Sequence, residues 1–121
     1  MADWLVKTEP GDYSFEDLRK DEETVWTGVK NPVALKNLRA MKKGDRVIVY
    51  HTGNVKSAVG AATVTAAGPD VVLRAGRPLP RPLPLKEIRE SSLFSDSPLV
   101  RIGRLSVVRL TSAQYAFLAK G

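Results

Sequence analysis

A run of prolines restricts where one segment of this chain can lie in a folded protein. Residues 80–84 are Pro-Arg-Pro-Leu-Pro, so three of these five positions lack the amide hydrogen that a strand donates to its neighbours. The segment therefore cannot lie between two strands in the middle of a sheet. Residues 71–79 favour a strand, and we expect residues 80–84 to form an edge or a connector after it.

Strand patterns recur along the rest of the chain. The strongest is Arg-Val-Ile-Val-Tyr-His at residues 46–51, which is rich in β-branched side chains and is followed by a turn at Thr52-Gly53-Asn54. The small and apolar residues after the turn should pair with it. We expect strands at residues 4–7, 46–51, 55–67, 71–79 and 104–110.

Helix-start signals separate these strands. Ser14 is followed by an acid at the third position, and Asn31-Pro32 combines a capping side chain with a proline at the first helical position. Residues 24–29 lack helical periodicity and contain a glycine, so they predict a structured loop. We expect short helices from about residue 15, over residues 32–42, over residues 85–90 and after Thr111, with Ala34, Leu38 and Met41 buried on the second.

Short strands and short helices alternate without a regular strand–helix–strand rhythm, which argues against a doubly wound parallel sheet. The pattern predicts an α+β fold with a barrel-like mixed sheet of about five to six strands and short flanking helices. The chain has 121 residues, of which 43% are hydrophobic, and this is enough for one core. We therefore expect residues 1–121 to form a single domain.

Composition excludes several kinds of site. The sequence has no cysteine, so it holds no disulfide, no thiolate metal site and no cysteine nucleophile. It has one histidine and no common catalytic or phosphate-cradling motif, and we expect neither a metal nor a cofactor. No apolar run approaches the roughly 18 residues that span a bilayer. We expect a cytoplasmic monomer that does not contact membranes.

Charge is distributed unevenly along the chain. Residues 1–23 contain eight acids and three bases, whereas residues 24–121 contain sixteen bases and five acids. A basic surface attracts polyanions and favours phosphate contacts, so nucleic acid is the expected partner, although a merely solubilising surface would have the same composition. The residues expected to contact the nucleic-acid backbone are Lys30, Lys36, Arg39, Lys42, Lys43, Arg74, Arg77 and Arg81.

Several loop residues combine a flat aromatic face with short polar groups. A base extruded from a strand offers a π-face for stacking and a polar edge for hydrogen bonds, so a tryptophan with nearby polar groups is chemically sufficient to hold one. Core packing is the alternative explanation for Trp26, and we assign Trp4 to the core. The candidate base-pocket residues are Lys7, Thr8, Glu9, Trp26, Gly28, Val29, Asn31, Asn37, Tyr50, His51 and Thr52.

Glu9 and His51 are the only plausible acid–base pair for catalysis, and both lie at the ends of expected strands. The alternatives are a partly buried histidine that satisfies a loop carbonyl and a surface carboxylate beside Lys7. An enzyme or a nucleotide-binding regulator that uses this pair therefore stays open, but no sequence motif supports it.

Several segments in order resemble the EVE domain family, which is similar in fold to the PUA and YTH domains. The most specific are Trp-Leu-Val-Lys-Thr-Glu-Pro at residues 4–10, Tyr-Ser-Phe-Glu-Asp-Leu at residues 13–18 and Val-Trp-Thr-Gly-Val-Lys-Asn at residues 25–31. Residues 37–45, 49–52, 79–82 and 105–107 continue the match. The resemblance implies a PUA-like fold and a non-catalytic reader of a methylated or hydroxymethylated cytosine, or a methylated adenine, in DNA or RNA.

By this resemblance, Trp26 stacks on the base, the residues around Lys7 and Asn31 line the polar wall, and Tyr50 with its two successors lies opposite. The chain departs from the family pattern at Thr27 and Lys30, where an acid and an arginine are usual, at Pro32 and Leu35, and in the short connection at residues 68–71. A PUA-like RNA-binding protein that does not require a modified base is the competing interpretation.

Overall fold

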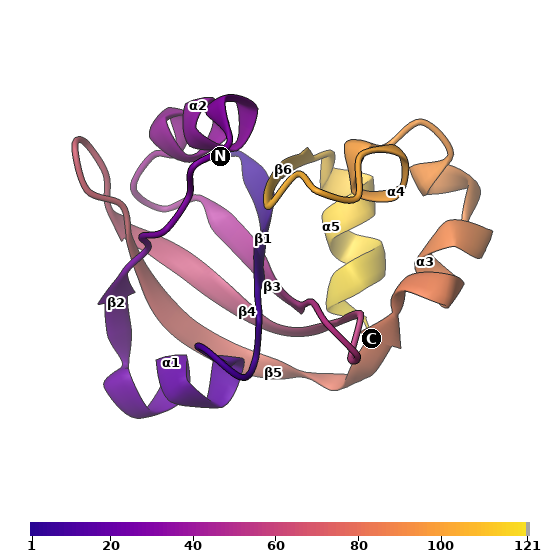
Figure 1. The fold of residues 1–121 in the computed structure, drawn as a ribbon, viewed down its shortest axis with the longest axis horizontal. Helices are drawn as coiled ribbons and strands as arrows, with labels where there is room; N and C mark the ends of the chain where they lie inside the picture. The colour runs from indigo at the N-terminus through magenta and orange to yellow at the C-terminus, as the bar shows by residue number, and fades with distance from the viewer. Residues whose placement is uncertain (121) are drawn as a thin grey trace.

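The structure, a computed structural model, describes residues 1–120 and contains one mixed sheet with short helices around it (Figure 1). The strands follow the order β2-β5-β4-β3-β1-β6 across the sheet. The elements are β1 (Asp3–Thr8), α1 (Phe15–Asp21), β2 (Glu23–Val25), α2 (Pro32–Ala40), β3 (Arg46–His51), β4 (Ser57–Ala66), β5 (Val72–Pro84), α3 (Leu85–Glu90), the 3₁₀ turn η1 (Ser92–Phe94), α4 (Pro98–Arg101), β6 (Val107–Leu110) and α5 (Ser112–Ala119).

Strand β1 lies inside the sheet, parallel to β3 and antiparallel to β6. Its first four residues are all buried, which explains why Trp4–Val6 are continuously apolar rather than alternating, and the buried Asp3 is paired with Arg46. The other pairs are antiparallel, and the sheet curls into a half-barrel. The α+β prediction with five to six strands is therefore confirmed.

The proline run lies in the second half of β5, which continues without a break from Val72 to Pro84. β2 pairs only with Val72–Arg74, whereas β4 pairs with β5 on its other side as far as Pro84. The Ala75 amide still donates to the Glu22 carbonyl oxygen at 3.0 Å; beyond it β4 is the strand that pairs with β5, and the missing amides can face away from β4. The expectation that residues 80–84 form an edge segment is confirmed. These residues continue the strand of residues 72–79 directly and do not form a separate element.

The helix starts follow the expected capping chemistry. The Ser14 side chain accepts a hydrogen bond from the Asp17 amide, and the Asp17 carboxylate accepts one from the Ser14 amide. Asn31 caps α2, and Thr111 caps α5. Helix α2 ends at Ala40, two residues before the expected end, and Ala34, Leu38 and Met41 are buried as predicted.

Residues 24–29 are not entirely a loop, because Glu23–Val25 form the short strand β2. Three residues are too few to show a strand periodicity, and β2 exists because it pairs with the start of β5. The late strand also begins at Val107 rather than at residue 104, and the two short turns η1 and α4 before it had no sequence prediction.

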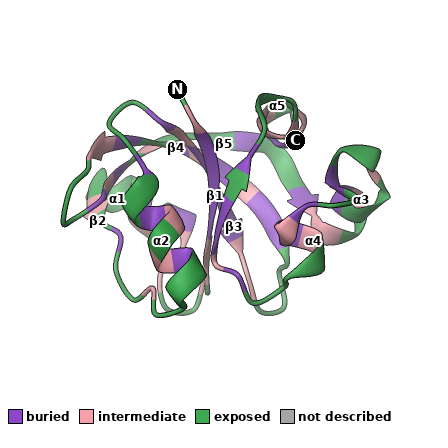
Figure 2. Cartoon of the chain, turned by 90° about the horizontal axis from the view of Figure 1, so that it is seen from above, coloured by how far each residue is buried: buried purple, intermediate pink, exposed green. Residues whose placement is uncertain are grey.

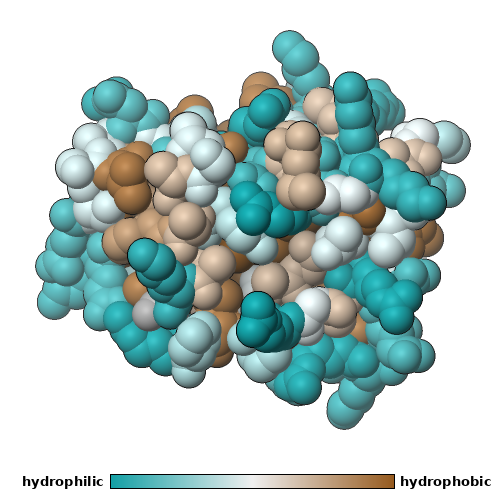
Figure 3. Space-filling model, turned by 180° about the vertical axis from the view of Figure 1, so that it is seen from behind, coloured by the Kyte–Doolittle hydropathy of each residue, from teal (hydrophilic) through white to brown (hydrophobic). Residues whose placement is uncertain are grey.

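Buried residues run along the strands, and the outer sides of the helices are exposed (Figure 2). From behind, hydrophobic atoms gather near the middle of the surface inside a hydrophilic border (Figure 3). Helix α1 packs against β5 and β2, and the ring of its first residue, Phe15, reaches β4 at Gly60, where a Cβ would overlap that ring. Within residues 1–120, no helix is long and apolar enough to cross a membrane.

Candidate nucleic-acid interface

A pocket lies between the end of β1, the segment that leads into α1 and the segment around β2. Its volume is about 190 Å³. Small-molecule sites typically measure about 300–1,000 Å³, so this pocket suits a single ring system rather than a whole cofactor. We call it the Trp26 pocket, and its lining residues are Thr8, Tyr13, Thr24, Val25, Trp26 and Thr27.

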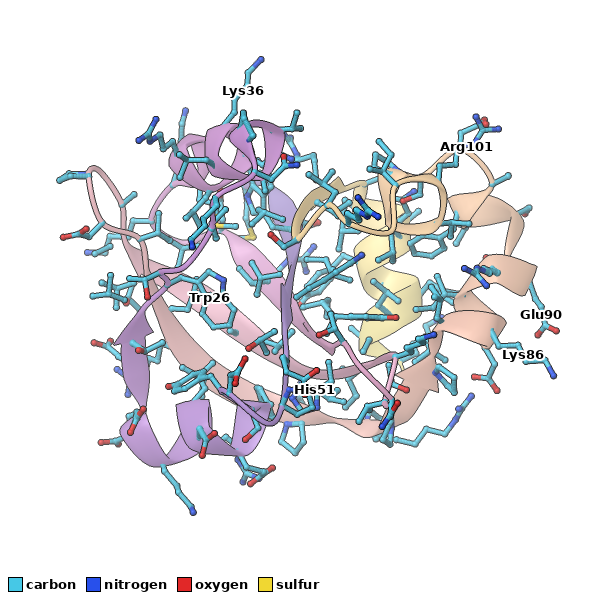
Figure 4. All side chains as sticks on the ribbon, viewed as in Figure 1. Trp26, Lys36, His51, Lys86, Glu90 and Arg101 are labelled. Atoms are coloured by element: carbon cyan, nitrogen blue, oxygen red, sulfur yellow. The ribbon has the colours of Figure 1, made fainter. Side chains whose placement is uncertain are left out.

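Two aromatic rings form one wall of the Trp26 pocket. The rings of Tyr13 and Trp26 meet edge to face, with centroids 6.3 Å apart and an interplanar angle of 79°. Trp26 is 8% exposed and points from the β2 side toward the interior of the half-barrel (Figure 4). Its amide donates a hydrogen bond to the Val71 carbonyl oxygen at 2.8 Å, which fixes the backbone at the start of the loop.

Hydroxyl groups surround these rings. The Tyr13 hydroxyl donates to Asp21 at 2.8 Å, and burial together with this carboxylate raises the pKa of Tyr13, which keeps the phenol neutral. The Thr8 hydroxyl donates to the Tyr13 carbonyl oxygen at 2.6 Å, and the Thr8 carbonyl accepts from the Thr52 amide at 2.9 Å. The pocket therefore offers aromatic surface and neutral hydroxyls on a fixed backbone.

Glu9 and His51 both support backbone turns next to this pocket. The His51 Nε2 atom accepts a hydrogen bond from the Phe15 amide, the first of α1, at 3.0 Å. Burial lowers the pKa of His51, although the charge of Glu9 acts in the opposite direction. Glu9 accepts from the Gly11 amide at 3.0 Å and packs against Gly53, whose φ is +72°. His51, which we expected in the base pocket, lines neither pocket; it accepts from a helix amide, which differs from the alternative role of satisfying a loop carbonyl.

Lys7, Tyr50 and Thr52 line a different pocket, on the other side of β1. Side chains of successive strand residues point to opposite faces, so Lys7 and Thr8 cannot enter the same pocket. This second pocket has a volume of about 240 Å³. We call it the Lys7 pocket, and its polar lining residues include Lys7, Tyr50, Thr52, Lys56 and Arg89. The predicted base-pocket residues are therefore divided between two sites.

The remaining predicted pocket residues belong to the loop after Trp26 and to α2. Asn31 accepts from the Val33 and Ala34 amides at 2.9 and 3.1 Å, so its carbonyl oxygen is occupied by capping. The Asn37 side chain donates to the Val107 carbonyl oxygen at 2.8 Å and ties α2 to β6.

Gly28 has a φ of +80°, which favours glycine, and Val29 packs partly against the core. Neither Gly28, Val29, Asn31 nor Asn37 lines the Trp26 pocket.

The predicted backbone-contacting cations do not form one surface. Arg74 and Arg81 are seven residues apart on β5, a separation of about 23 Å at roughly 3.3 Å per residue. Arg74 pairs with Glu23 at 3.8 Å and Arg81 with Glu87 at 2.8 Å. Lys36 points outward from α2, away from Trp26 (Figure 4). The other exposed cations of this set are Lys30, Arg39, Lys42, Lys43 and Arg77.

Sequence reasoning missed several residues that the structure places at the two pockets. Tyr13 belongs to a segment that carried the family resemblance, but it was not assigned to the base pocket. Its signal was available, because it lies between the end of the first strand and a helix cap. Lys56 and Arg89 had no local signal, because one follows a turn and the other lies on a short helix far along the chain. Only the tertiary fold brings them to Lys7.

Comparison with protein families identifies the EVE domain. The model of the EVE domain matches residues 2–121. Among curated proteins, human thymocyte nuclear protein 1 is 38% identical over 60 residues, a match that covers 40% of this chain and 27% of the human protein. The chain thus spans about a quarter of the length of the curated relatives that it matches.

Solved structures share the whole fold. A crystal structure of a protein from Agrobacterium tumefaciens is 32% identical with a TM-score of 0.93, and the match covers 99% of this chain and 92% of that one. A crystal structure of the human THYN1 protein in complex with DNA that contains 5-methylcytosine is 24% identical with a TM-score of 0.85. That match covers 98% of this chain and 96% of the human one, and it establishes similarity of fold.

Proposed function

This chain belongs to the EVE domain family, and we propose that it binds nucleic acid by holding one flipped-out modified base in the Trp26 pocket. The observation that carries the proposal is the pair of aromatic rings, Tyr13 and Trp26, at the wall of a pocket of about 190 Å³. Stacking of a base on an aromatic side chain contributes roughly 1–3 kcal/mol. The hydroxyl protons of Thr8 and Tyr13 are donated to the Tyr13 carbonyl oxygen and to Asp21, so their oxygens supply acceptors for the amino edge of the base.

A methyl group on the base increases the apolar area that the pocket buries. Val25 lines the pocket and is 43% exposed in the free protein, so it offers a surface that a methylated base could cover. One buried methylene-sized group contributes about 0.8 kcal/mol, which corresponds to an affinity ratio of about four. We therefore expect a measurable but moderate preference for the methylated base.

Two further observations support this assignment. The human THYN1 protein, which has the same fold, has been crystallised with DNA that contains 5-methylcytosine, and this supports methylated cytosine as the first ligand to test. Glu9 and His51 each hold a backbone amide, so their arrangement suits a structural role better than acid–base catalysis. The proposed activity is therefore binding without a chemical step.

The charge around the Trp26 pocket restricts how a nucleic acid approaches. Asp21, Glu22 and Glu23 lie at the junction of α1 and β2, beside the pocket, and Asp21 contacts Tyr13 directly. Carboxylates repel backbone phosphates, so the polymer should not run across this junction. The backbone is expected to lie on the side of the pocket away from α1 and β2.

The test is a binding series with short single- and double-stranded oligonucleotides of DNA and RNA. Each sequence is prepared plain, with 5-methylcytosine, with 5-hydroxymethylcytosine and with N6-methyladenine, and is measured at two salt concentrations. The wild-type protein is compared with Trp26→Ala, and circular dichroism establishes that the variant is folded at the temperature used.

The proposal predicts tighter binding of at least one modified oligonucleotide and loss of this preference in Trp26→Ala. Equal, salt-dependent binding of plain and modified oligonucleotides that is insensitive to the substitution would instead support a binder of the backbone alone. Absence of binding to every oligonucleotide would reject nucleic acid as the ligand.

A further inference from the structure

The Lys7 pocket, on the opposite side of β1 from the Trp26 pocket, has a different chemical character. It is formed by the end of β1, the turn between β3 and β4, helix α3 and the turn after α4. Three of its lining residues are cations, namely Lys7, Lys56 and Arg89, and none is an acid. Within residues 1–120, the ion pairs of the molecule include none of these three cations. The pocket therefore gathers three cations that form no ion pair, and the carboxylate nearest to its lining, that of Glu9, packs against Gly53 and accepts from the Gly11 amide.

Lys7 is held in place at the wall of this pocket. Its Nζ atom donates a hydrogen bond to the Gly103 carbonyl oxygen at 2.9 Å and lies 5.6 Å from the centre of the Tyr50 ring. Burial lowers the pKa of Lys7, which shows that the charged ammonium is partly desolvated there. A charge that loses water without gaining an opposite charge is unfavourable, and a bound anion would offset that cost.

Lys56 has an unusual backbone conformation for its residue type. Its φ is +45°, in the left-handed region where a residue with a Cβ is strained and glycine is not. The Lys56 carbonyl accepts a hydrogen bond from the Leu85 amide at 2.8 Å, which holds this conformation. Strained residues are concentrated at functional sites, and here the strained position carries a cation that faces the pocket.

We propose that the Lys7 pocket binds a phosphate group. Tyr50 and Thr52 add hydroxyl groups to the three cations, and hydroxyls and cations are the usual partners of phosphate oxygens.

We further assign this phosphate to the nucleic-acid backbone, next to the base in the Trp26 pocket, and this part rests on the proposed function. Strand β1 runs down the middle of Figure 1, with α1 and β2 on one side and α3 and α4 on the other. Since Lys7 and Thr8 are consecutive, the two pockets meet at the end of one strand, and a nucleotide could place its base on one side and a neighbouring phosphate on the other. The Lys7 pocket also lies on the side away from the acids of α1 and β2.

The test combines a variant with an altered ligand. The variant Lys56→Gly/Arg89→Ala removes two cations without touching the Trp26 pocket, and glycine relieves the strained backbone at position 56. The control Arg19→Ala/Lys20→Ala removes two exposed cations from α1 and so matches the test variant in net charge. The single variant Lys20→Ala gives the effect of one exposed cation. Oligonucleotides carry a neutral methylphosphonate linkage in place of the phosphate on the 5′ or the 3′ side of the modified base.

We expect Lys56→Gly/Arg89→Ala to weaken binding of plain and modified oligonucleotides alike and to keep the preference for the modified base. The salt slope, which is the slope of the logarithm of the binding constant against the logarithm of the salt concentration, should fall in magnitude by about one unit. One of the two neutral linkages should weaken binding by the wild-type protein but not by this variant, because both changes remove the same contact. Equal losses in wild type and variant for both linkages, or a variant that behaves like the control, would overturn the backbone assignment.

Inorganic phosphate distinguishes the two possible sources of the ligand. Titration followed by the amide resonances of residues 50–56 should show binding to the wild-type protein and none to the variant. Binding of inorganic phosphate without coupling to either linkage would overturn the backbone assignment and leave a site for a free phosphate compound. If modified and plain oligonucleotides bind equally, the base proposal fails, but the linkage comparison on plain oligonucleotides still tests the Lys7 pocket.

Discussion

The two sides of strand β1 carry different chemistry although they share consecutive residues. On the Thr8 side, two aromatic rings and neutral hydroxyls line a pocket beside an acidic helix, and on the Lys7 side three cations line a pocket without an acid. The alternation of side chains along the strand produces this division. In the two proposals above, residues that are adjacent in sequence serve two recognition tasks, reading a base and holding a phosphate.

The largest expected effect is that of Trp26→Ala compared with Trp4→Ala. Both tryptophans are buried, at 8% and 2% exposure, so each truncation should reduce the free energy of unfolding by about 3–5 kcal/mol. Trp26 lines the Trp26 pocket, whereas Trp4 lines neither that pocket nor the Lys7 pocket, and its indole donates to Asp45 at 2.9 Å. Trp26→Ala should also lose about 1–3 kcal/mol of binding, or roughly 5- to 150-fold in affinity.

Chemical denaturation and oligonucleotide titration, both at low temperature, separate the two effects. Loss of the modified-base preference in Trp4→Ala as well would mean that overall stability, and not the Trp26 pocket, controls recognition.

Gly60→Ala tests whether the seating of α1 maintains the Thr8 side. A Cβ at this position would overlap the Phe15 ring, and overpacking of this kind costs about 1–3 kcal/mol of stability. Displacement of α1 would disturb the Trp26 pocket, so modified-base preference should fall while the salt slope stays unchanged. Thermal melting and titration check this. Val33→Ala is the control, because Val33 is 55% exposed on α2 and lines neither the Trp26 pocket nor the Lys7 pocket, and an equal effect of both substitutions would contradict the assignment.

Tyr13→Phe keeps the aromatic wall and removes the hydroxyl that donates to Asp21. Because this hydrogen bond is exposed, its loss should cost under about 1 kcal/mol, near the lower part of the range for a single hydrogen bond. The preference for a modified base should persist, since the ring remains. A complete loss of preference, measured by the same titration, would show that the hydroxyl reads the base.

The smallest expected effect is a pH dependence through His51. Its pKa is lowered in the folded protein from the ordinary value of 6.5, mainly by burial, so below this value the unfolded chain binds more protons. Neutral His51 therefore contributes fully to the free energy of unfolding above pH 6.5. This contribution is lost as the pH falls through the pKa of His51 in the folded protein, because protonation removes the acceptor for the Phe15 amide. In urea denaturation, the free energy of unfolding should fall less between pH 7.5 and pH 5.5 for His51→Gln than for the wild-type protein. An identical change in both proteins would contradict this role.

The fold was largely predictable because most of its elements carry local signals. The caps at Ser14, Asn31 and Thr111 and the apolar strands were recognisable in sequence, and the proline run correctly predicted a segment with one neighbour. The short strand β2 was missed because only its pairing with β5 defines it.

The site was less predictable, because sequence adjacency does not show which face of a strand a side chain occupies. Lys7 and Thr8 were assigned to one pocket and lie in two. Lys56 and Arg89 reach Lys7 only through the turn after β3 and the packing of α3, which no local pattern encodes. Asn37 also reaches β6 only in the folded chain.

The most direct test of base binding uses the fact that the chain has two tryptophans. In Trp4→Phe, the intrinsic fluorescence reports Trp26 alone, and in Trp26→Phe it reports Trp4. Titration with an oligonucleotide that contains 5-methylcytosine should quench the emission of Trp4→Phe, because the base stacks on Trp26, and should leave that of Trp26→Phe unchanged. Saturating binding with no change in the emission of Trp26, or equal quenching in both variants, would contradict a base in the Trp26 pocket.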